Sequence, residues 1–275
     1  MKPPRFDYVR AESRAEAIQV LAAEGADARV IAGGQTLIPM LSMRLARPKV
    51  LVDIMGLAEL GRIEHRDGTL HVGSAVRQSA LLALPDLARV QPLLAQALPW
   101  VGHAQTRNRG TVCGSIAHAD PSAELPLVLI ALEGEVHLAR RWRQRKVRAQ
   151  DFLVGMMSTA RADDELITGV TFPQARPGQG FAFREFGRRH GDFALTACAA
   201  VADAASIRLA IGGVADRPVA RTWGNLTGSA LEDALNELAH ALDARDDLHA
   251  SARMRRDLVR KLGAQTIAEA RRCRD

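Results

Sequence analysis

Residues 107–126, RNRGTVCGSIAHADPSAELP, form a long polar stretch that is rich in small residues and lies between apolar segments. The wider range 102–121 has few apolar positions, so we predict an irregular loop there. Loops of this length inside a compact domain usually carry function. Small residues let a backbone approach an extended ligand closely, and Asp120 or Glu124 could accept hydrogen bonds from its hydroxyl groups. In the alternative interpretation, Asp120 and Pro121 only begin a turn and cap the following helix.

A second glycine-bearing loop lies upstream, at residues 31–39, IAGGQTLIP. It follows a predicted strand and precedes a predicted helix. Gly33 and Gly34 allow backbone N–H groups to turn toward a phosphate, and the start of a helix at Thr36 adds the positive end of its dipole. The loop matches neither the Walker A pattern nor GxGxxG, and a plain tight turn is the alternative.

The sequence around these loops predicts an α+β protein in three parts, at residues 1–57, 58–176 and 177–275. Strands are expected at 6–9, 28–32, 50–54, 69–73, 165–172, 181–186, 194–202 and 206–211, with a hairpin over 135–147. Helices are expected at 15–23, 36–45, 79–84, 87–101, 231–244 and 251–270. Residues 125–132 are apolar throughout and fit either a buried helix or a strand. Residues 174–180 are the best candidate for a linker.

Composition excludes several classes of protein. The chain has 275 residues, of which 47% are hydrophobic and 25% charged, so it can build a sizeable core and is not intrinsically disordered. The sequence contains no run of about 18 apolar residues, so we predict no transmembrane helix. The first residues, MKPPRF, lack the apolar core of a signal peptide, so we expect a cytoplasmic protein.

Charge and cysteine content bear on the ligands. The net charge of +6 is compatible with nucleic acid, an acidic partner or an anionic cofactor, but aromatic residues make up only 4%, which argues against base stacking on nucleic acid. Cys113, Cys198 and Cys273 are too few and too far apart for a disulfide framework or an iron–sulfur cluster, so we expect no metal in this chain. The basic segment 140–148 is interpreted first as a solvated face, then as a docking surface for a partner subunit, and last as a nucleic-acid contact.

The two loops closely resemble those of the flavoprotein (medium) subunits of molybdenum hydroxylases, the carbon monoxide, xanthine and nicotinate dehydrogenase-type enzymes. The segments DFLVG (151–155), DELIT (164–168) and RRHGDFA (188–194) fit the same family in the same order, and the resemblance covers essentially the whole chain. It implies an FAD-binding fold of the vanillyl-alcohol-oxidase (PCMH) type in two subdomains, 1–57 and 58–176. A small C-terminal α+β domain, 177–275, would follow.

The same resemblance implies a set of residues that bind FAD and no catalytic residue in this chain. Glu124 would hydrogen-bond the cofactor, Ile167 would lie near the adenine or flavin, and Arg184 would lie by the flavin. The phosphate-binding walls would be formed by Arg29, Val30, Ile31, Ala32, Gly33, Gly34, Gln35 and Thr36, and by Thr111, Val112, Cys113, Gly114 and Ser115. The family usually has Gly where this chain has Cys113, so the side chain must point away from the phosphate.

The function that the resemblance implies is electron transfer within a heteromeric molybdenum hydroxylase. Noncovalent FAD would take electrons from the [2Fe-2S] clusters of a small partner subunit, which serves a large molybdopterin subunit. It would pass them to an external acceptor such as NAD, a quinone or oxygen. Two alternatives remain open at this point: a stand-alone flavin-dependent oxidase of the same superfamily, and a non-enzymatic nucleotide-binding protein. A purified protein with an oxidised-flavin spectrum would exclude the second.

Overall fold

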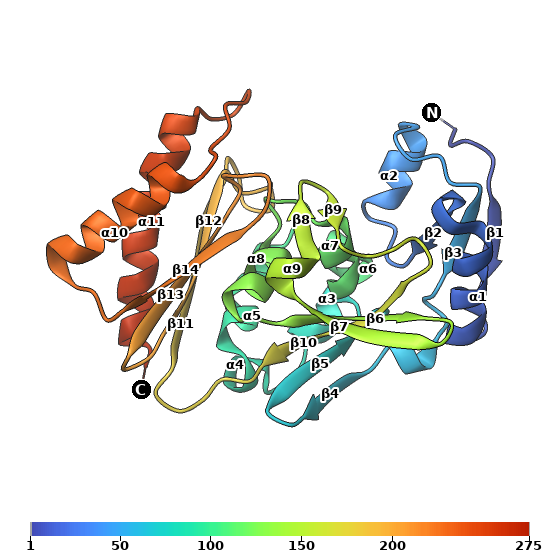
Figure 1. Ribbon diagram of the computed structural model, residues 1–275, viewed down its shortest axis with the longest axis horizontal. Coiled ribbons are helices and arrows are strands. Elements are labelled where there is room, and N and C mark those ends of the chain that lie inside the picture. The colour runs from blue at the N-terminus through green and yellow to red at the C-terminus, as the bar shows by residue number, and fades with distance from the viewer. Residues whose placement is uncertain (1, 275) are drawn as a thin grey trace.

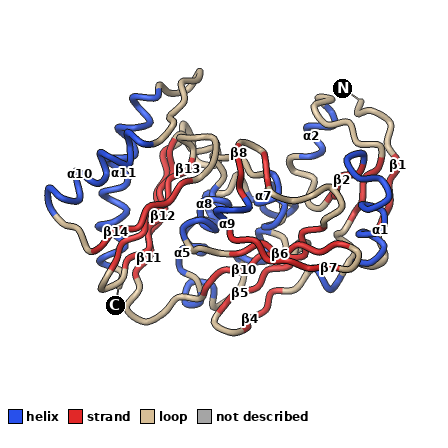
Figure 2. Tube along the Cα trace, viewed as in Figure 1, coloured by secondary structure: helices blue, strands red, loops and turns tan. Residues whose placement is uncertain are grey.

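The computed structural model describes residues 2–274, which form three larger sheets in chain order and one two-stranded sheet, with helices packed between and around them (Figures 1 and 2). The first sheet lies within residues 1–57, the second within 58–176 and the third within 177–275. The α+β prediction is therefore confirmed, whereas the division into domains at these boundaries stays a prediction. Within residues 2–274, no helix is both long and apolar enough to cross a membrane.

The first sheet is small and parallel, in the order β1-β3-β2. Its strands are β1 (Asp7–Arg10), β2 (Ala28–Ile31) and β3 (Val50–Asp53), connected by helices α1 (Arg14–Glu24) and α2 (Leu37–Ser42). Ser13 caps α1 as its side chain accepts a hydrogen bond from the N–H of Glu16 at 3.1 Å. Helix α2 is shorter than expected because the chain turns at Arg44, whose φ is +59°.

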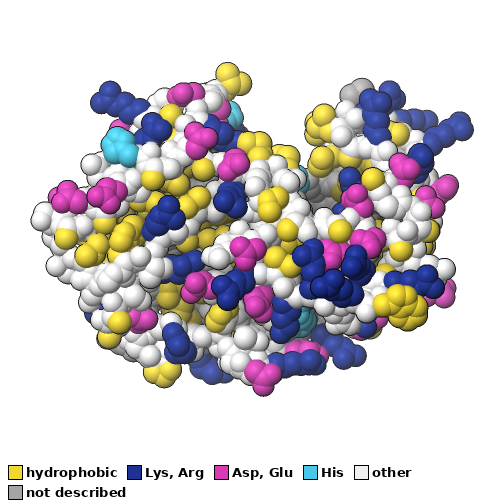
Figure 3. All heavy atoms as spheres, in the orientation of Figure 1, with side chains coloured by type: hydrophobic (Ala, Val, Ile, Leu, Met, Phe, Trp, Pro, Cys, Tyr) yellow, Lys and Arg dark blue, Asp and Glu magenta, His cyan; other side chains and the backbone are white. Residues whose placement is uncertain are grey.

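The second sheet is antiparallel, in the order β4-β5-β10-β6-β7. Its strands are β4 (Ile63–Arg66), β5 (Thr69–Gly73), β6 (Glu135–Arg140), β7 (Arg143–Arg148) and β10 (Leu166–Pro173). A separate small hairpin consists of β8 (Leu153–Gly155) and β9 (Ser158–Thr159). The predicted basic hairpin is β6–β7, and Lys and Arg side chains gather around it on the face shown in Figure 3.

Short helices fill the space between the second and third sheets. They are α3 (Gln78–Leu82), α4 (Leu87–Val90), α5 (Pro92–Ala97), α6 (Ala104–Arg109), α7 (Val112–His118), α8 (Glu124–Ala131) and α9 (Ala149–Phe152). The prediction of an irregular loop over 102–121 is wrong, because α6 and α7 occupy most of it. The prediction of a single helix over 87–101 is also wrong. The segment forms two short helices, which are interrupted at Gln91 before Pro92, and it ends in a 3-10 turn that contains Pro99.

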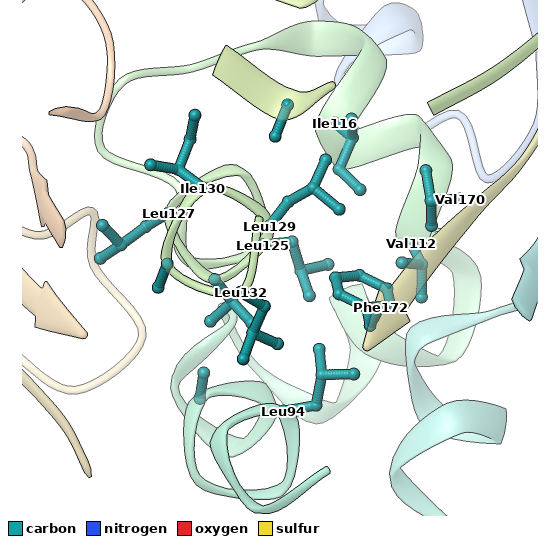
Figure 4. Packing of buried hydrophobic residues seen from close by; sticks show 14 of the residues in the cluster. Leu94, Val112, Ile116, Leu125, Leu127, Leu129, Ile130, Leu132, Val170 and Phe172 are labelled. Atoms are coloured by element: carbon teal, nitrogen blue, oxygen red, sulfur yellow. The ribbon is translucent and has the colours of Figure 1, made fainter. Parts of the chain in front are cut away.

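The apolar segment 125–132, which the sequence left open between a helix and a strand, forms helix α8. This helix lies at the centre of the main core (Figure 4). Every residue of α8 is buried, as expected for a helix that is apolar on all sides. Leu125 and Leu129 pack with Ile116 of α7 and with Phe172 of β10 in one cluster. This core fixes the position of α7, and therefore of the chain on either side of it.

The third sheet is an antiparallel meander, and two long helices cover its outer face (Figure 1). Its elements are β11 (Gly180–Phe186), β12 (Thr196–Ala202), β13 (Ser206–Gly212), β14 (Val219–Gly224), α10 (Gly228–Ala241) and α11 (Ala252–Arg272). The inner face of this sheet joins the main core through Phe181, Phe183 and Ala197, while the outer face forms a second core under α10 and α11. Strand β14 had not been expected from the sequence.

Candidate functional site

A cleft of about 670 Å³ opens between the first sheet and the rest of the molecule. Figure 3 shows this side of the molecule hollowed between α2 and the β8–β9 hairpin. Its walls come from the loop after β2, from the α7 region, and from residues 191–193 after β11. The sequence-predicted residues that line it are Arg29, Val30, Ala32, Gly33, Gly34, Gln35, Thr36, Thr111, Cys113, Gly114, Ser115, Glu124 and Ile167.

Three of the sequence-predicted residues lie outside this wall. Ile31 belongs to the β2 ladder opposite Asp53, and Val112 is buried in the main core. Arg184 lies on the outer face of β11, where its guanidinium donates to Glu269 of α11 at 2.8 Å. Side chains alternate between the two faces of a strand. Arg184 therefore points away from the main core, and its neighbour Glu185 lies on the inner face of the sheet.

The two glycine loops meet at Gly33. A Cβ atom built on Gly33 would lie 2.7 Å from both the carbonyl carbon of Arg109 and the Cα of Gly110, and closer still to the Arg109 oxygen. These are backbone atoms that cannot move aside cheaply. The loop after β2 and the chain between α6 and α7 are therefore in direct backbone contact at the wall of the cleft, and only glycine permits that approach.

The first loop offers free backbone donors. Within residues 2–274, the N–H groups of Gly33, Gly34, Gln35 and Thr36 make no hydrogen bond to the protein. The loop holds its shape by other means: the Gln35 side-chain amide donates to the Gly33 carbonyl at 3.2 Å, and Gly34 adopts a φ of +70°. Consecutive unpaired N–H groups around a left-handed glycine are typical of an anion-binding loop.

The second loop forms the opposite wall as the first turn of α7. Thr111 caps that helix, because its hydroxyl accepts from the Gly114 N–H at 3.0 Å, so this N–H is already used. Cys113 is only 2% exposed, and its thiol lies 3.7 Å from the Val72 carbonyl of β5. Its φ is outside the left-handed region, so this position does not require glycine, and its thiol packs in the main core.

Two buried polar atoms in the cleft wall have no partner in the protein. The Ser74 hydroxyl and the Gln78 side-chain oxygen line the cleft, are 3% and 4% exposed by residue, and make no hydrogen bond within residues 2–274. Unsatisfied buried polar groups are rare, and a bound ligand would satisfy both. Sequence reasoning missed these residues; the signal was a second strand end, at Gly73, followed by small and polar residues.

The charges of the cleft favour an anion at one end. Arg29 and Arg161 both line it, and burial together with the positive charge of Arg29 lowers the pKa of Arg161. Arg161 is held by hydrogen bonds to the carbonyls of Ala162 and Glu165, each at 2.8 Å. Asp163 is an ion-pair partner of both guanidiniums, at 3.8 Å from Arg29 and 3.7 Å from Arg161, so one carboxylate faces two positive charges in a cleft that the free N–H groups of the first loop also line.

Apolar side chains complete the cleft. Leu37, Met40 and Ile54 line it from the first sheet, and Leu166 and Phe193 from the other walls. Within residues 2–274, no three His, Cys, Asp or Glu side chains are grouped to hold a metal ion. Free backbone donors, arginines, orphan polar atoms and apolar walls together fit an extended anionic ligand with flat rings, such as a flavin dinucleotide.

Comparison with known proteins identifies the family. Residues 4–175 match the model of the FAD binding domain in molybdopterin dehydrogenase, and residues 181–270 match the CO dehydrogenase flavoprotein C-terminal domain. Among curated relatives, the alpha subunit of the 6-hydroxypseudooxynicotine dehydrogenase complex from Paenarthrobacter nicotinovorans is 38% identical over 98% of this chain and 96% of its own length. The carbon monoxide dehydrogenase medium chain of Hydrogenophaga pseudoflava is 34% identical over 88% of this chain and 87% of its own.

Solved structures agree. A chain of quinoline 2-oxidoreductase from Pseudomonas putida 86 is 35% identical and superposes with a TM-score of 0.92, covering 100% of this chain and 99% of that one. A chain of Cu,Mo-CO dehydrogenase is 28% identical with a TM-score of 0.94, covering 99% of both chains. Sequence, fold and cleft thus agree, and this chain belongs to the family of FAD-binding medium subunits of the molybdenum hydroxylases.

Proposed function

We propose that this chain holds one noncovalent FAD in the cleft and passes electrons through it, as one subunit of a heteromeric molybdenum hydroxylase. The observation that carries the site is the loop 33–36, whose free N–H groups line the same cleft as Arg29 and Arg161. Bound FAD would supply the chemistry that couples one-electron donors to a two-electron acceptor. The part of this chain is to bind, orient and shield that cofactor.

Each wall has its own task in this proposal. The N–H groups of residues 33–36 and the Arg29 guanidinium would hold the pyrophosphate, since both favour negative charge. Ser74 and Gln78 would satisfy polar atoms of the ligand and be satisfied in return. Leu37, Met40 and Phe193 would keep water from the rings. No residue of this chain has to act as a general acid or base for electrons to pass.

The proposed partners are a large molybdopterin subunit and a small subunit with [2Fe-2S] clusters. Curated relatives carry names such as "complex subunit alpha" and "medium subunit", which describe parts of larger assemblies. The external acceptor would be NAD, a quinone or oxygen, and we expect no nucleic acid partner. The substrate would bind to the large subunit, so no residue of this chain selects it.

Co-purification from the native source tests this function. A tagged chain should bring down two further subunits, with molybdenum, iron and one FAD per tagged chain. The same chain purified alone, free of molybdenum and iron, should stay inactive in a substrate-dependent dye-reduction assay. Dye reduction by that isolated chain would overturn the subunit assignment and favour the stand-alone oxidase.

A further inference from the structure

Arg255 is a buried arginine that lies far along the chain from both glycine loops. It belongs to the first turn of α11, the helix that covers the outer face of the third sheet (Figure 1), and it is 3% exposed. A charged side chain is costly to bury unless it is paired and hydrogen-bonded. It does not line the cleft, so its partners must show what it does.

The guanidinium group of Arg255 connects three separate loops. Its Nη1 atom donates to the carbonyl of Leu195 at 2.6 Å and to that of Gly213 at 2.7 Å. Its Nε atom donates to the carbonyl of Arg245 at 3.1 Å, and Nη2 pairs with the Asp247 carboxylate at 2.5 Å. One rigid, planar group thus holds the connections β11–β12, β13–β14 and α10–α11 together.

The first of these connections, residues 187–195, reaches the cleft. Residues 191–193 form part of the cleft wall. The loop is closed at its base, because the N–H of Leu195 donates to the carbonyl of Phe186 at 2.8 Å. Arg255 therefore binds the carbonyl of the very residue that closes the loop.

The far end of the same loop rests on the chain before α6. The rings of His190 and Trp100 have their centroids 4.8 Å apart. A Cβ atom built on Gly191, whose φ is +89°, would lie 2.7 Å from His103 Nδ1 and 3.1 Å from the Gly102 carbonyl oxygen. The loop is thus fixed by close packing at its tip and by the guanidinium group at its base.

The second connection also reaches the cleft wall. The N–H of Gly213 donates to the carbonyl of Pro121 at 2.7 Å, and Pro121 follows Asp120, which lines the cleft. A Cβ atom on Gly213 would lie 2.8 Å from the Ala194 carbonyl oxygen, so the two connections are in direct backbone contact. Arg255 therefore acts on two neighbouring segments of one wall.

We propose that Arg255 is a positioning residue for FAD. From α11 it fixes residues 191–193 and the chain at Pro121 in the arrangement that the cofactor requires, so the two C-terminal helices contribute to FAD affinity without lining the cleft. This inference rests on the proposed FAD site. The competing explanation is that Arg255 only stabilises the fold around the third sheet, and the experiments below separate the two.

Hydrogen–deuterium exchange of the FAD-free chain tests the anchoring itself. Arg255→Met removes the donors and keeps a long side chain, whereas Leu238→Ala weakens the core under the same two helices and removes no hydrogen bond to the loop. The amide of Leu195 should exchange at least about tenfold faster in Arg255→Met than in Leu238→Ala, because hydrogen bonds to a charged group are among the stronger ones. Equal exchange in the two variants would overturn the anchoring.

The dissociation constant for FAD, measured by quenching of flavin fluorescence, tests the link to the cofactor. Circular dichroism sets a temperature at which both variants are folded. Arg255→Met should bind FAD at least about fivefold more weakly than Leu238→Ala, which is the lower end of usual couplings between separate sites. Equal affinities would show that Arg255 only stabilises the fold and would overturn the proposal.

A second variant covers the case in which Arg255→Met does not fold. Arg255→Lys keeps the positive charge beside Asp247 but lacks the planar fork that spans three loops, so the same expected and contradicting results apply to it. Absence of FAD binding to the wild-type chain would refute the proposed function and with it the role toward FAD. The exchange measurement would still decide whether Arg255 anchors the loop.

Discussion

Gly33→Ala is the sharpest test of the contact between the two loops. The added methyl group would lie 2.7 Å from the Arg109 carbonyl carbon and the Gly110 Cα, and closer to the Arg109 oxygen, and these atoms cannot yield without separating the loops. Overpacking of this kind costs about 1–3 kcal/mol. If that cost falls on the docked arrangement that FAD requires, the dissociation constant should rise by roughly 5- to 150-fold, since 1.4 kcal/mol corresponds to about tenfold.

The assay is titration of the FAD-free protein followed by flavin fluorescence. Gly224→Ala is the control, because a Cβ at that position meets no atom within 4 Å and its φ is not positive. Circular dichroism should show both variants folded at the titration temperature, so that a loss of affinity is not a loss of structure. Wild-type affinity in a folded Gly33→Ala variant would refute the close contact of the loops as a wall of the site.

Four further results are expected. Acid precipitation of the flavin-loaded protein should release the yellow colour into the supernatant if FAD is bound noncovalently, as we propose; colour in the pellet would contradict this. Gly34→Val should abolish FAD binding, since a β-branched residue strongly disfavours the φ of +70° at that position, and full flavin occupancy would disprove the phosphate-loop assignment. In the folded chain only Cys273 should react rapidly with a thiol reagent at pH 8, because burial raises the pKa of the Cys113 and Cys198 thiols; fast reaction of all three would show that the core is open. Burial and the neighbouring His71 lower the pKa of His137 to about 4, so the melting temperature should fall as the pH drops from about 6.5 toward 4, and less so in His137→Asn; identical profiles would exclude His137 as the cause.

The sequence predicted best those helices and strands whose ends are marked by capping residues or glycines. Ser13 capping a helix with regular apolar spacing placed α1 to within a residue or two at each end. The alternating and β-branched segments predicted most strands, and both glycine loops were found because Gly before a polar helix start is visible in the sequence. Strand β14 was missed because its stability comes from pairing with β13 across its whole length, a tertiary contact.

The site was predicted less completely than the fold. Helix α7 was missed because only three of its residues, Val112, Cys113 and Ile116, are buried, and small residues give a weak periodic signal. Placing Arg184 beside the flavin required knowing the face of β11 on which it lies, and a shift of one residue exchanges the two faces. Ser74 and Gln78 belong to no motif; the strand end at Gly73 before them is a weak signal in the sequence, and their burial without partners marks them in the structure.

Hydrogen–deuterium exchange of the backbone amides, measured with and without FAD, tests the central claim most directly. The N–H groups of residues 33–36 make no hydrogen bond within the described chain, so they should exchange quickly in the FAD-free protein. Bound FAD should slow exchange there and in the first turn of α7, with little change in α10 and α11. Protection confined to other parts of the chain, or unchanged exchange at residues 33–36 in flavin-saturated protein, would contradict the assignment of this cleft as the FAD site.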